Sequence, residues 1–221
     1  MGKIQSRWLK ITIAVFVMSV FFVKASPTEA VTVPFTDLNK LDTHYEAIVT
    51  LYNDGIVNGV TSTKYKPYNF ATRGEAALYI ANALELDTKN VENPNFKDVP
   101  KSSKYYGAIA ALVKKGVVKG YSNQTFKPDS SLTRSQLAKM LTLGFDLPIS
   151  SSLSTNFTDV KKMTDTDGRR YIQTLIDYKI TVGTTPVTFS PYAPLLRGQL
   201  ATFIYRTLGN DGDNLEVISV E

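Results

Sequence analysis

Three arginines recur along the sequence in the same local setting. Arg73 lies in the segment Thr72-Arg-Gly-Glu75, and similar segments surround Arg134 and Arg197, at steps of 61 and 63 residues. A guanidinium group can hold a carboxylate through two parallel hydrogen bonds. The first turn of a helix also attracts anions through its free backbone N–H groups and its dipole. If these segments begin helices, the arginines are candidates for binding an anionic ligand.

The arginine segments end a longer pattern that occurs three times, which indicates a repeat protein. Each copy opens with Phe-x-Asp, passes through a glycine and an aromatic-x-Pro sequence, and closes with the arginine segment. The opening aspartates are Asp37, Asp98 and Asp159, the glycines are Gly59, Gly120 and Gly183, and the aromatic residues are Tyr65, Phe126 and Phe189. A small insertion around residues 164–168 accounts for the extra length of the third copy. The arginines therefore have a second interpretation, in which each pairs with a repeat carboxylate such as an opening aspartate and joins the repeats.

Each copy predicts a helix, an irregular loop and a second helix. Apolar residues at helical spacing begin the first helix at Tyr45, Tyr106 and about Ile172. Gly55 and Gly116 follow these helices where a left-handed cap favours glycine, and Lys179 holds that place in the third copy.

The second helix begins at the arginine segment. Thr72 with Glu75, and Thr133 with Gln136, have the spacing of a capping box. Leu196 replaces the threonine in the third copy. We therefore expect a looser helix start there, and a smaller contribution of Arg197 to binding.

The predicted organisation is a signal peptide, three repeats and a short acidic tail, at residues 1–30, 31–90, 91–152, 153–209 and 210–221. The first segment carries Lys3, Arg7 and Lys10 before an uncharged apolar run of 13 residues. That run is short for a membrane span, which needs about 20 residues, and it is typical of a cleaved secretory signal. Cleavage is expected after Ala30 or after Ala25. Removing this segment also removes most of the +5 net charge, so the sequence does not indicate nucleic-acid binding.

The composition excludes several classes of enzyme. The chain has 43% apolar and 20% charged residues, as folded proteins do, but no cysteine and only one histidine, His44. Disulfide frameworks, thiol catalysis and cysteine zinc sites are therefore excluded. A single histidine also disfavours a Ser-His-Asp triad or a zinc hydrolase. Asp165 and Asp167 do not complete a calcium loop. We predict no catalytic residue, no metal site and no cofactor, and we expect His44 to be solvated.

The repeated pattern combines a Phe-x-Asp-Val start, a Gly-Ile-x-x-Gly helix end, an aromatic-x-Pro loop and a Thr-Arg-x-Glu segment. This pattern resembles the S-layer homology (SLH) family. The resemblance covers residues 33–208. It implies a mainly α fold, in which three helix-loop-helix repeats form a pseudo-threefold, three-pronged spindle around a three-helix bundle. It also implies non-catalytic, non-covalent anchoring of an exported protein at the bacterial cell wall or surface layer. The implied partner is a secondary cell-wall polysaccharide that carries pyruvate ketals, bound by arginines in grooves between the repeats.

The resemblance turns the repeated residues into candidate polysaccharide contacts. The candidates are Arg73, Arg134, Arg197, Asp37, Asp98, Asp159, Gly59, Gly120, Gly183 and Tyr121. The aspartates either cap the following turn or accept sugar hydroxyls. The glycines either adopt a positive φ or allow a close approach of the backbone.

The sequence departs from the family where a tryptophan is usual, about six residues after the opening aspartate. Thr43, Lys104 and Asp167 stand there instead. Any stacking on a sugar must then come from tyrosines beside turn residues, at Tyr68, Tyr121 and Tyr192. The aromatic-x-Pro residues are expected to be hydrophobic plugs. A structural role in assembling a surface layer through protein–protein contacts is the alternative function.

Overall fold

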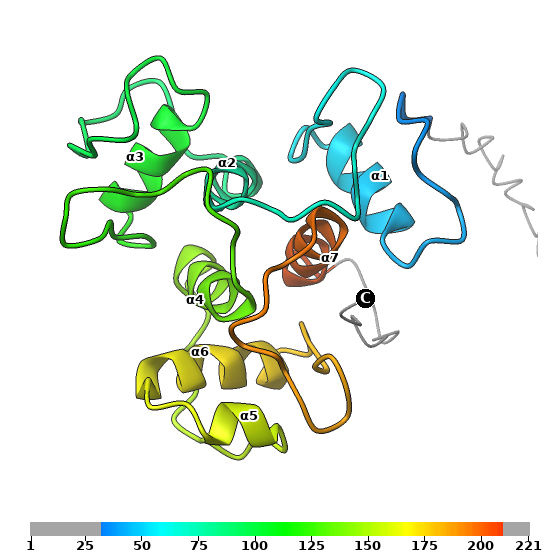
Figure 1. The fold of residues 1–221 in the computed structure, drawn as a ribbon, viewed down its shortest axis with the longest axis vertical. Helices are drawn as coiled ribbons and strands as arrows, with labels where there is room; N and C mark the ends of the chain where they lie inside the picture. Colours follow the sequence, from blue (N-terminus) through cyan, green and yellow to red (C-terminus); the bar gives the residue numbers. More distant parts are fainter. Residues whose placement is uncertain (1–31, 210–221) are drawn as a thin grey trace, which may run out of the picture. The chain divides into compact units, whose positions relative to one another are not determined.

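The computed structural model describes residues 32–209, so the predicted signal peptide and acidic tail lie outside the described residues. Within that range the regular elements are seven α-helices, joined by loops with isolated β-bridges (Figure 1). They are α1 (Tyr45–Asn53), α2 (Arg73–Ala83), α3 (Tyr106–Lys114), α4 (Arg134–Gly144), α5 (Thr158–Lys161), α6 (Thr166–Asp177) and α7 (Arg197–Thr207). The predicted mainly α fold with helix-loop-helix repeats is confirmed. In residues 32–209, no helix combines the length and apolar character that a membrane crossing requires.

The capping boxes start the second helices as predicted. Thr72 Oγ1 accepts a hydrogen bond from Glu75 N at 3.2 Å, and Glu75 Oε2 accepts one from Thr72 N at 2.9 Å. Thr133 and Gln136 form the same pair of bonds in α4. At α7 only half of the box exists, because Leu196 has no side-chain oxygen. Gln199 Oε1 still accepts from Leu196 N at 3.1 Å.

The first helices of the repeats end in a left-handed residue. The φ angles are +73° at Gly55 and +82° at Gly116, as the sequence predicts, and Lys179 adopts a φ of +55° at the same place in the third repeat. The insertion in the third repeat lengthens α6 at its start. Asp165 caps this start by accepting a hydrogen bond from Gly168 N at 2.9 Å.

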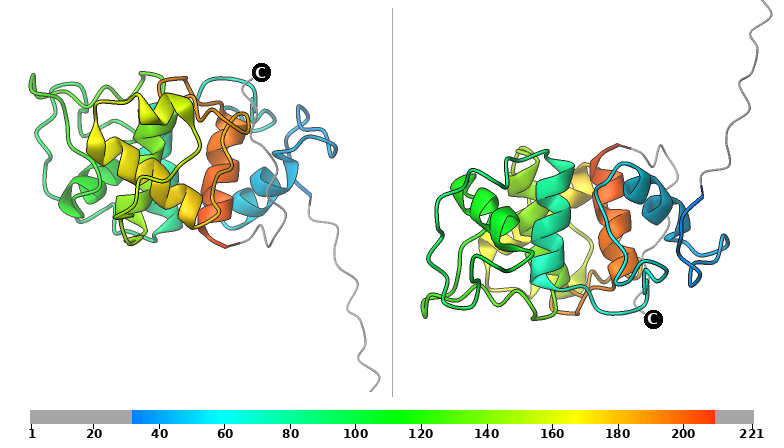
Figure 2. Two further views of the ribbon diagram at one scale, coloured as in Figure 1. Left: turned by 90° about the horizontal axis from the view of Figure 1, so that it is seen from below. Right: turned by 90° about the horizontal axis from the view of Figure 1, so that it is seen from above.

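The helices pack between repeats rather than within them. Helix α3 packs on α2, α6 packs on α4, and α1 packs on α7, so each first helix lies on the second helix of another repeat. Figures 1 and 2 show these three pairs. Helices α2, α4 and α7 also contact one another, as a central bundle requires. The pseudo-threefold symmetry of the spindle stays a prediction.

Leucine and isoleucine side chains from each pair form the core. Fully buried examples are Leu51, Ile80, Leu112, Leu141, Leu175 and Ile204. Because these residues come from all three repeats, no repeat buries its apolar face by itself, as expected for repeat proteins. The contact of α1 with α7 joins the first repeat to the third and closes the set.

Candidate ligand-binding site

Each repeated arginine reaches from the start of its helix into the loop of another repeat. The Nε–H groups of Arg73, Arg134 and Arg197 donate to the carbonyl oxygens of Phe126, Phe189 and Tyr65, at 3.0, 2.7 and 2.9 Å. Each guanidinium also lies over the ring of the same aromatic residue, with Cζ 4.6 to 4.7 Å from the ring centroid. We call these places the Arg73, Arg134 and Arg197 junctions.

The aromatic residues of the junctions are hydrophobic plugs, as predicted. Tyr65, Phe126 and Phe189 have no exposed surface. A plug that holds its arginine through both a carbonyl and a ring orders the guanidinium before any ligand arrives. Such ordering lowers the conformational entropy that binding must remove.

The prediction of free backbone N–H groups at these helix starts is wrong. Arg73 N donates to Ser130 O at 3.0 Å, and Gly74 N donates to Pro128 O at 2.8 Å. The same two bonds recur at the starts of α4 and α7, with acceptors in the loops of the third and first repeats. The first-turn donors are therefore used by neighbouring loops, which sequence periodicity cannot reveal. At these helix starts the arginine side chains, rather than the backbone N–H groups, are then the candidate anion donors.

The opening aspartates bind the backbone of the aromatic-x-Pro loop. Asp98 accepts hydrogen bonds from Phe126 N at 2.8 Å and from Lys127 N at 2.7 Å. Asp37 and Asp159 make the equivalent bonds in their own repeats. These bonds hold a residue of positive φ in each loop, at Lys66, Lys127 and Ser190.

This arrangement also lowers the pKa of Asp37. Burial alone would raise the pKa of Asp37, but hydrogen bonds from Tyr65 N and Lys66 N outweigh it and hold the pKa below its ordinary value. The aspartates accept hydrogen bonds from backbone N–H groups of the loops that carry the plugs, rather than from the arginines. The alternative in which an arginine pairs with a repeat carboxylate and joins two repeats is found at Arg197, whose partner is Glu75 rather than an opening aspartate. Contact of the aspartates with sugar stays a prediction.

The glycines of the pattern make room for the opening phenylalanines. A Cβ atom on Gly59, Gly120 or Gly183 would overlap the ring of the phenylalanine that opens the same repeat. Close approach is thus confirmed at all three positions, whereas a positive φ occurs only at Gly183, at +92°. The observed neighbours give these glycines a packing role, and contact with sugar stays a prediction.

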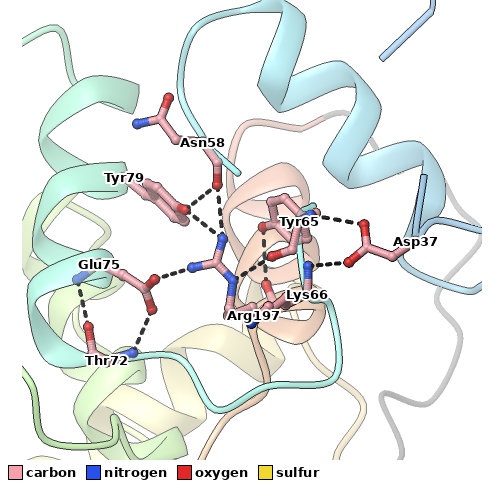
Figure 3. Close-up of polar contacts among 8 residues, drawn as sticks. All are labelled: Asp37, Asn58, Tyr65, Lys66, Thr72, Glu75, Tyr79 and Arg197. Atoms are coloured by element: carbon pink, nitrogen blue, oxygen red, sulfur yellow. Dashed lines mark hydrogen bonds and ion pairs between the residues drawn. The ribbon is translucent and has the colours of Figure 1, made fainter. Parts of the chain in front are cut away.

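The Arg197 junction satisfies every nitrogen of its guanidinium (Figure 3). Nη1 forms an ion pair with Glu75 Oε1. Nη2 donates to Asn58 O at 2.9 Å and to Tyr79 Oη at 3.1 Å. Burial alone would lower the pKa of Arg197, but Tyr79, Tyr65 and Glu75 outweigh it and raise the pKa.

The Arg134 junction lacks such acceptors. Arg134 is fully buried, and neither Nη1 nor Nη2 has a hydrogen-bond partner. Its Cζ lies 5.2 Å from the ring centroid of Phe203, which offers no oxygen. Burial lowers the pKa of Arg134 to about 10. A buried cation without acceptors is unfavourable, and an incoming carboxylate would relieve it.

The Arg73 junction combines an arginine with an exposed aromatic side chain. Arg73 Cζ lies 5.2 Å from the ring centroid of Tyr121, and Lys127 Nζ lies 4.6 Å from the same centroid. Tyr121 keeps 40% of its surface exposed. The predicted stacking residue therefore lies close to two cations, where a sugar with a carboxylate could contact both the ring and the charges.

A separate cavity of about 270 Å³ lies in the third repeat, next to Phe157. Its lining also includes Ile176, at the place that Tyr52 holds in the first repeat, where the Tyr52 ring packs edge-on against Phe35 at 4.8 Å. None of the three junction arginines lines this cavity.

The expectation that His44 is solvated is wrong. Its Nδ1 lies 2.8 Å from Thr202 Oγ1, and its ring lies against Gly198 of α7. Burial, assisted by Arg206, lowers the pKa of His44 to about 4. Sequence reasoning missed this contact because it joins residues 158 positions apart.

The sequence comparisons assign the chain to a family. The profile of the S-layer homology domain matches residues 34–77, 95–138 and 156–201, and the chain belongs to this family. It is thereby a cell-surface anchoring module, located at the cell wall or surface layer.

Proteins similar to the chain include two surface-layer proteins and one anchoring protein. It is 32% identical over 189 residues to the surface-layer 125 kDa protein of Lysinibacillus sphaericus, and 31% identical over 186 residues to S-layer protein EA1 of Bacillus anthracis. It is 30% identical over 159 residues to a cellulosome-anchoring protein of Acetivibrio thermocellus. The alignments cover 84%, 82% and 69% of this chain but only 16%, 21% and 35% of those proteins.

Proposed function

We propose that the chain is a non-catalytic module that binds a cell-wall polysaccharide through the carboxylates of its pyruvate ketals. The observation that supports this proposal is the pair of guanidinium groups at Arg73 and Arg134. Both are held in place by a loop carbonyl and an aromatic ring. The two terminal nitrogens of Arg134 are buried without a hydrogen-bonded acceptor. A carboxylate on a rigid sugar ring fits such a donor, because a guanidinium can bind both of its oxygens.

The Arg73 junction provides the principal contact in this proposal. Tyr121 is exposed beside the guanidinium, and Lys127 adds a second positive charge next to the same ring. A tyrosine can pack against the apolar face of a sugar and hydrogen-bond through its hydroxyl group. The tyrosine then supplies the contact for which the family ordinarily has a tryptophan.

Sedimentation with purified cell walls tests the proposal. Binding should fall when mild acid removes the ketals from the walls, and it should weaken as salt rises, because charge-assisted contacts near the surface are screened. Walls that retain the polysaccharide backbone without ketals are the matched control. Undiminished binding to these walls would refute the carboxylate mechanism. Equal self-association of the protein with and without walls would favour assembly of a surface layer by protein–protein contacts.

A further inference from the structure

The three junctions differ at two positions on the helix that faces each arginine. The residue that closes the capping box is Glu75 in the first repeat, Gln136 in the second and Gln199 in the third. One helical turn later stand Tyr79, Met140 and Phe203. The first repeat alone has an acid followed by a hydroxyl group.

The position of these residues is the same in each repeat, because the capping box fixes it. Glu75 Oε2, Gln136 Oε1 and Gln199 Oε1 all accept a hydrogen bond from the backbone N–H at the helix start. The residue one turn later faces the arginine in two junctions. Arg197 Nη2 donates to Tyr79 Oη, and the Arg134 guanidinium lies over Phe203. Glu75 contacts Arg197. The equivalent residues of the other repeats are therefore expected to lie beside the other two arginines, Gln199 beside Arg134 and Gln136 beside Arg73.

We infer that the carboxylate of Glu75 occupies the place on Arg197 that a ligand carboxylate takes on Arg73 and Arg134. The Arg197 junction is then a permanent clamp between the first and third repeats, and the chain has two sites for acidic sugars instead of three. This inference rests on the proposed function. It assigns Glu75 as the residue that decides how many pyruvate ketals one chain binds.

Charge is the physical reason. A ligand carboxylate that approached Arg197 would meet the Glu75 carboxylate at the same nitrogen, and like charges in one partly buried site repel. Displacing Glu75 would also break its ion pair with Arg197. At Arg73 and Arg134 the neutral glutamines present no such charge.

The substitution Glu75→Gln tests the inference, because it gives the first repeat the residue that the other two already have. A glutamine keeps the capping bond to the backbone, as Gln136 and Gln199 do. Glu85→Gln is the matched control. Glu85 is exposed just after α2, so this substitution removes the same charge away from the junctions.

The readout is the set of arginine Nε–H signals in ¹⁵N NMR spectra of the chain, assigned through single Arg→Lys variants. The Nε–H groups of all three junction arginines are hydrogen-bonded to carbonyl oxygens and buried, so they should exchange slowly enough to observe. The probe is a pyruvylated wall fragment, with the same fragment after ketal removal as its control.

In the native chain and in Glu85→Gln, we expect the fragment to shift the Arg73 and Arg134 signals and to leave the Arg197 signal in place. In Glu75→Gln the Arg197 signal should shift as well, with a dissociation constant within about tenfold of the Arg73 value. A ketal-dependent shift of Arg197 in the native chain would overturn the inference, and so would an unshifted Arg197 in folded Glu75→Gln. If no arginine signal shifts in any variant, the proposed function itself fails, which is a different outcome. Should Glu75→Gln fail to fold, the native titration alone still decides whether Arg197 takes a ligand.

Discussion

The guanidinium of Arg134 lies 5.2 Å from the ring centroid of Phe203, at the place where Arg197 meets the hydroxyl group of Tyr79. The two junctions differ in this hydroxyl group and in the residue that closes the capping box, which is Glu75 beside Arg197 and Gln199 in the repeat that faces Arg134. With the hydroxyl group, and with Glu75, Arg197 has an acceptor for every nitrogen. Without them, two nitrogens of Arg134 are buried and unsatisfied.

Stability should respond in opposite directions to Arg134→Met and Arg197→Met. The lowered pKa of Arg134 implies that its charge destabilises the folded state by about 3 kcal/mol at neutral pH. Methionine removes that charge and loses one hydrogen bond of about 1 kcal/mol, so the free energy of unfolding should rise by about 1 to 2 kcal/mol. Arg197→Met leaves Glu75 without its partner and should lower the free energy by about 3 to 5 kcal/mol. Urea unfolding of both variants measures this, and equal destabilisation would contradict it.

Affinity for a pyruvylated fragment should depend unequally on the three arginines. Losing one charge-assisted contact of roughly 1.5 to 3 kcal/mol weakens binding by about ten- to a hundredfold, and we expect this for Arg73→Ala and Arg134→Ala. Arg197→Ala should change the affinity of the folded protein less than about threefold, because Glu75 already holds that group. Titration calorimetry after a circular dichroism check decides the order. A largest loss at Arg197 would show that the ranking is wrong.

The basis of this ranking differs from the one that the sequence suggests. The missing threonine cap at Leu196 predicts a loose start of α7. In the structure Arg197 is nevertheless buried, and Gln199 still caps the backbone of Leu196. The contribution of Arg197 is limited by its internal partner rather than by mobility.

Acid should destabilise the protein through His44. In the unfolded chain this histidine titrates near 6.5, whereas burial holds its folded pKa at about 4. The stability that the neutral ring contributes is complete above pH 6.5 and is lost as the pH falls to about 4, for a total of about 3 kcal/mol. Arg206 adds to this effect and Asp42 opposes it. Urea unfolding measures the loss of unfolding free energy between pH 7 and pH 4.5. We expect this loss to be smaller for His44→Gln than for the native chain, and an equal loss in both would exclude His44 as its source.

Gly120 and Gly116 should differ in what an added methyl group does. Alanine at Gly120 would overlap the ring of Phe96, and overpacking of this kind lowers the free energy of unfolding by about 1 to 3 kcal/mol. Alanine at Gly116 meets open space and only the unfavourable φ of +82°, so about 1 kcal/mol is expected. Thermal unfolding measures both. If folded Gly120→Ala also lost more than about tenfold in fragment affinity, the glycine would be a ligand contact, as the sequence alone suggested.

The sequence by itself determined the local structure of this protein. Capping at Thr72 and Thr133, the left-handed ends at Gly55 and Gly116 and the plug residues depend on neighbours within a few positions, or on hydrophobicity alone. Their type and spacing were therefore sufficient. The threefold recurrence of the arginines likewise indicated that they share a role.

Only the tertiary structure decided which partner each arginine has. Glu75 and Arg197 are 122 positions apart, and they meet because α2 of the first repeat contacts α7 of the third. The loops of one repeat also take the first-turn N–H groups of another, which removes the backbone anion site that the helix starts suggested. Hydrogen bonds and ion pairs depend on distances of a few ångströms, and between distant segments those distances are set by packing rather than by spacing.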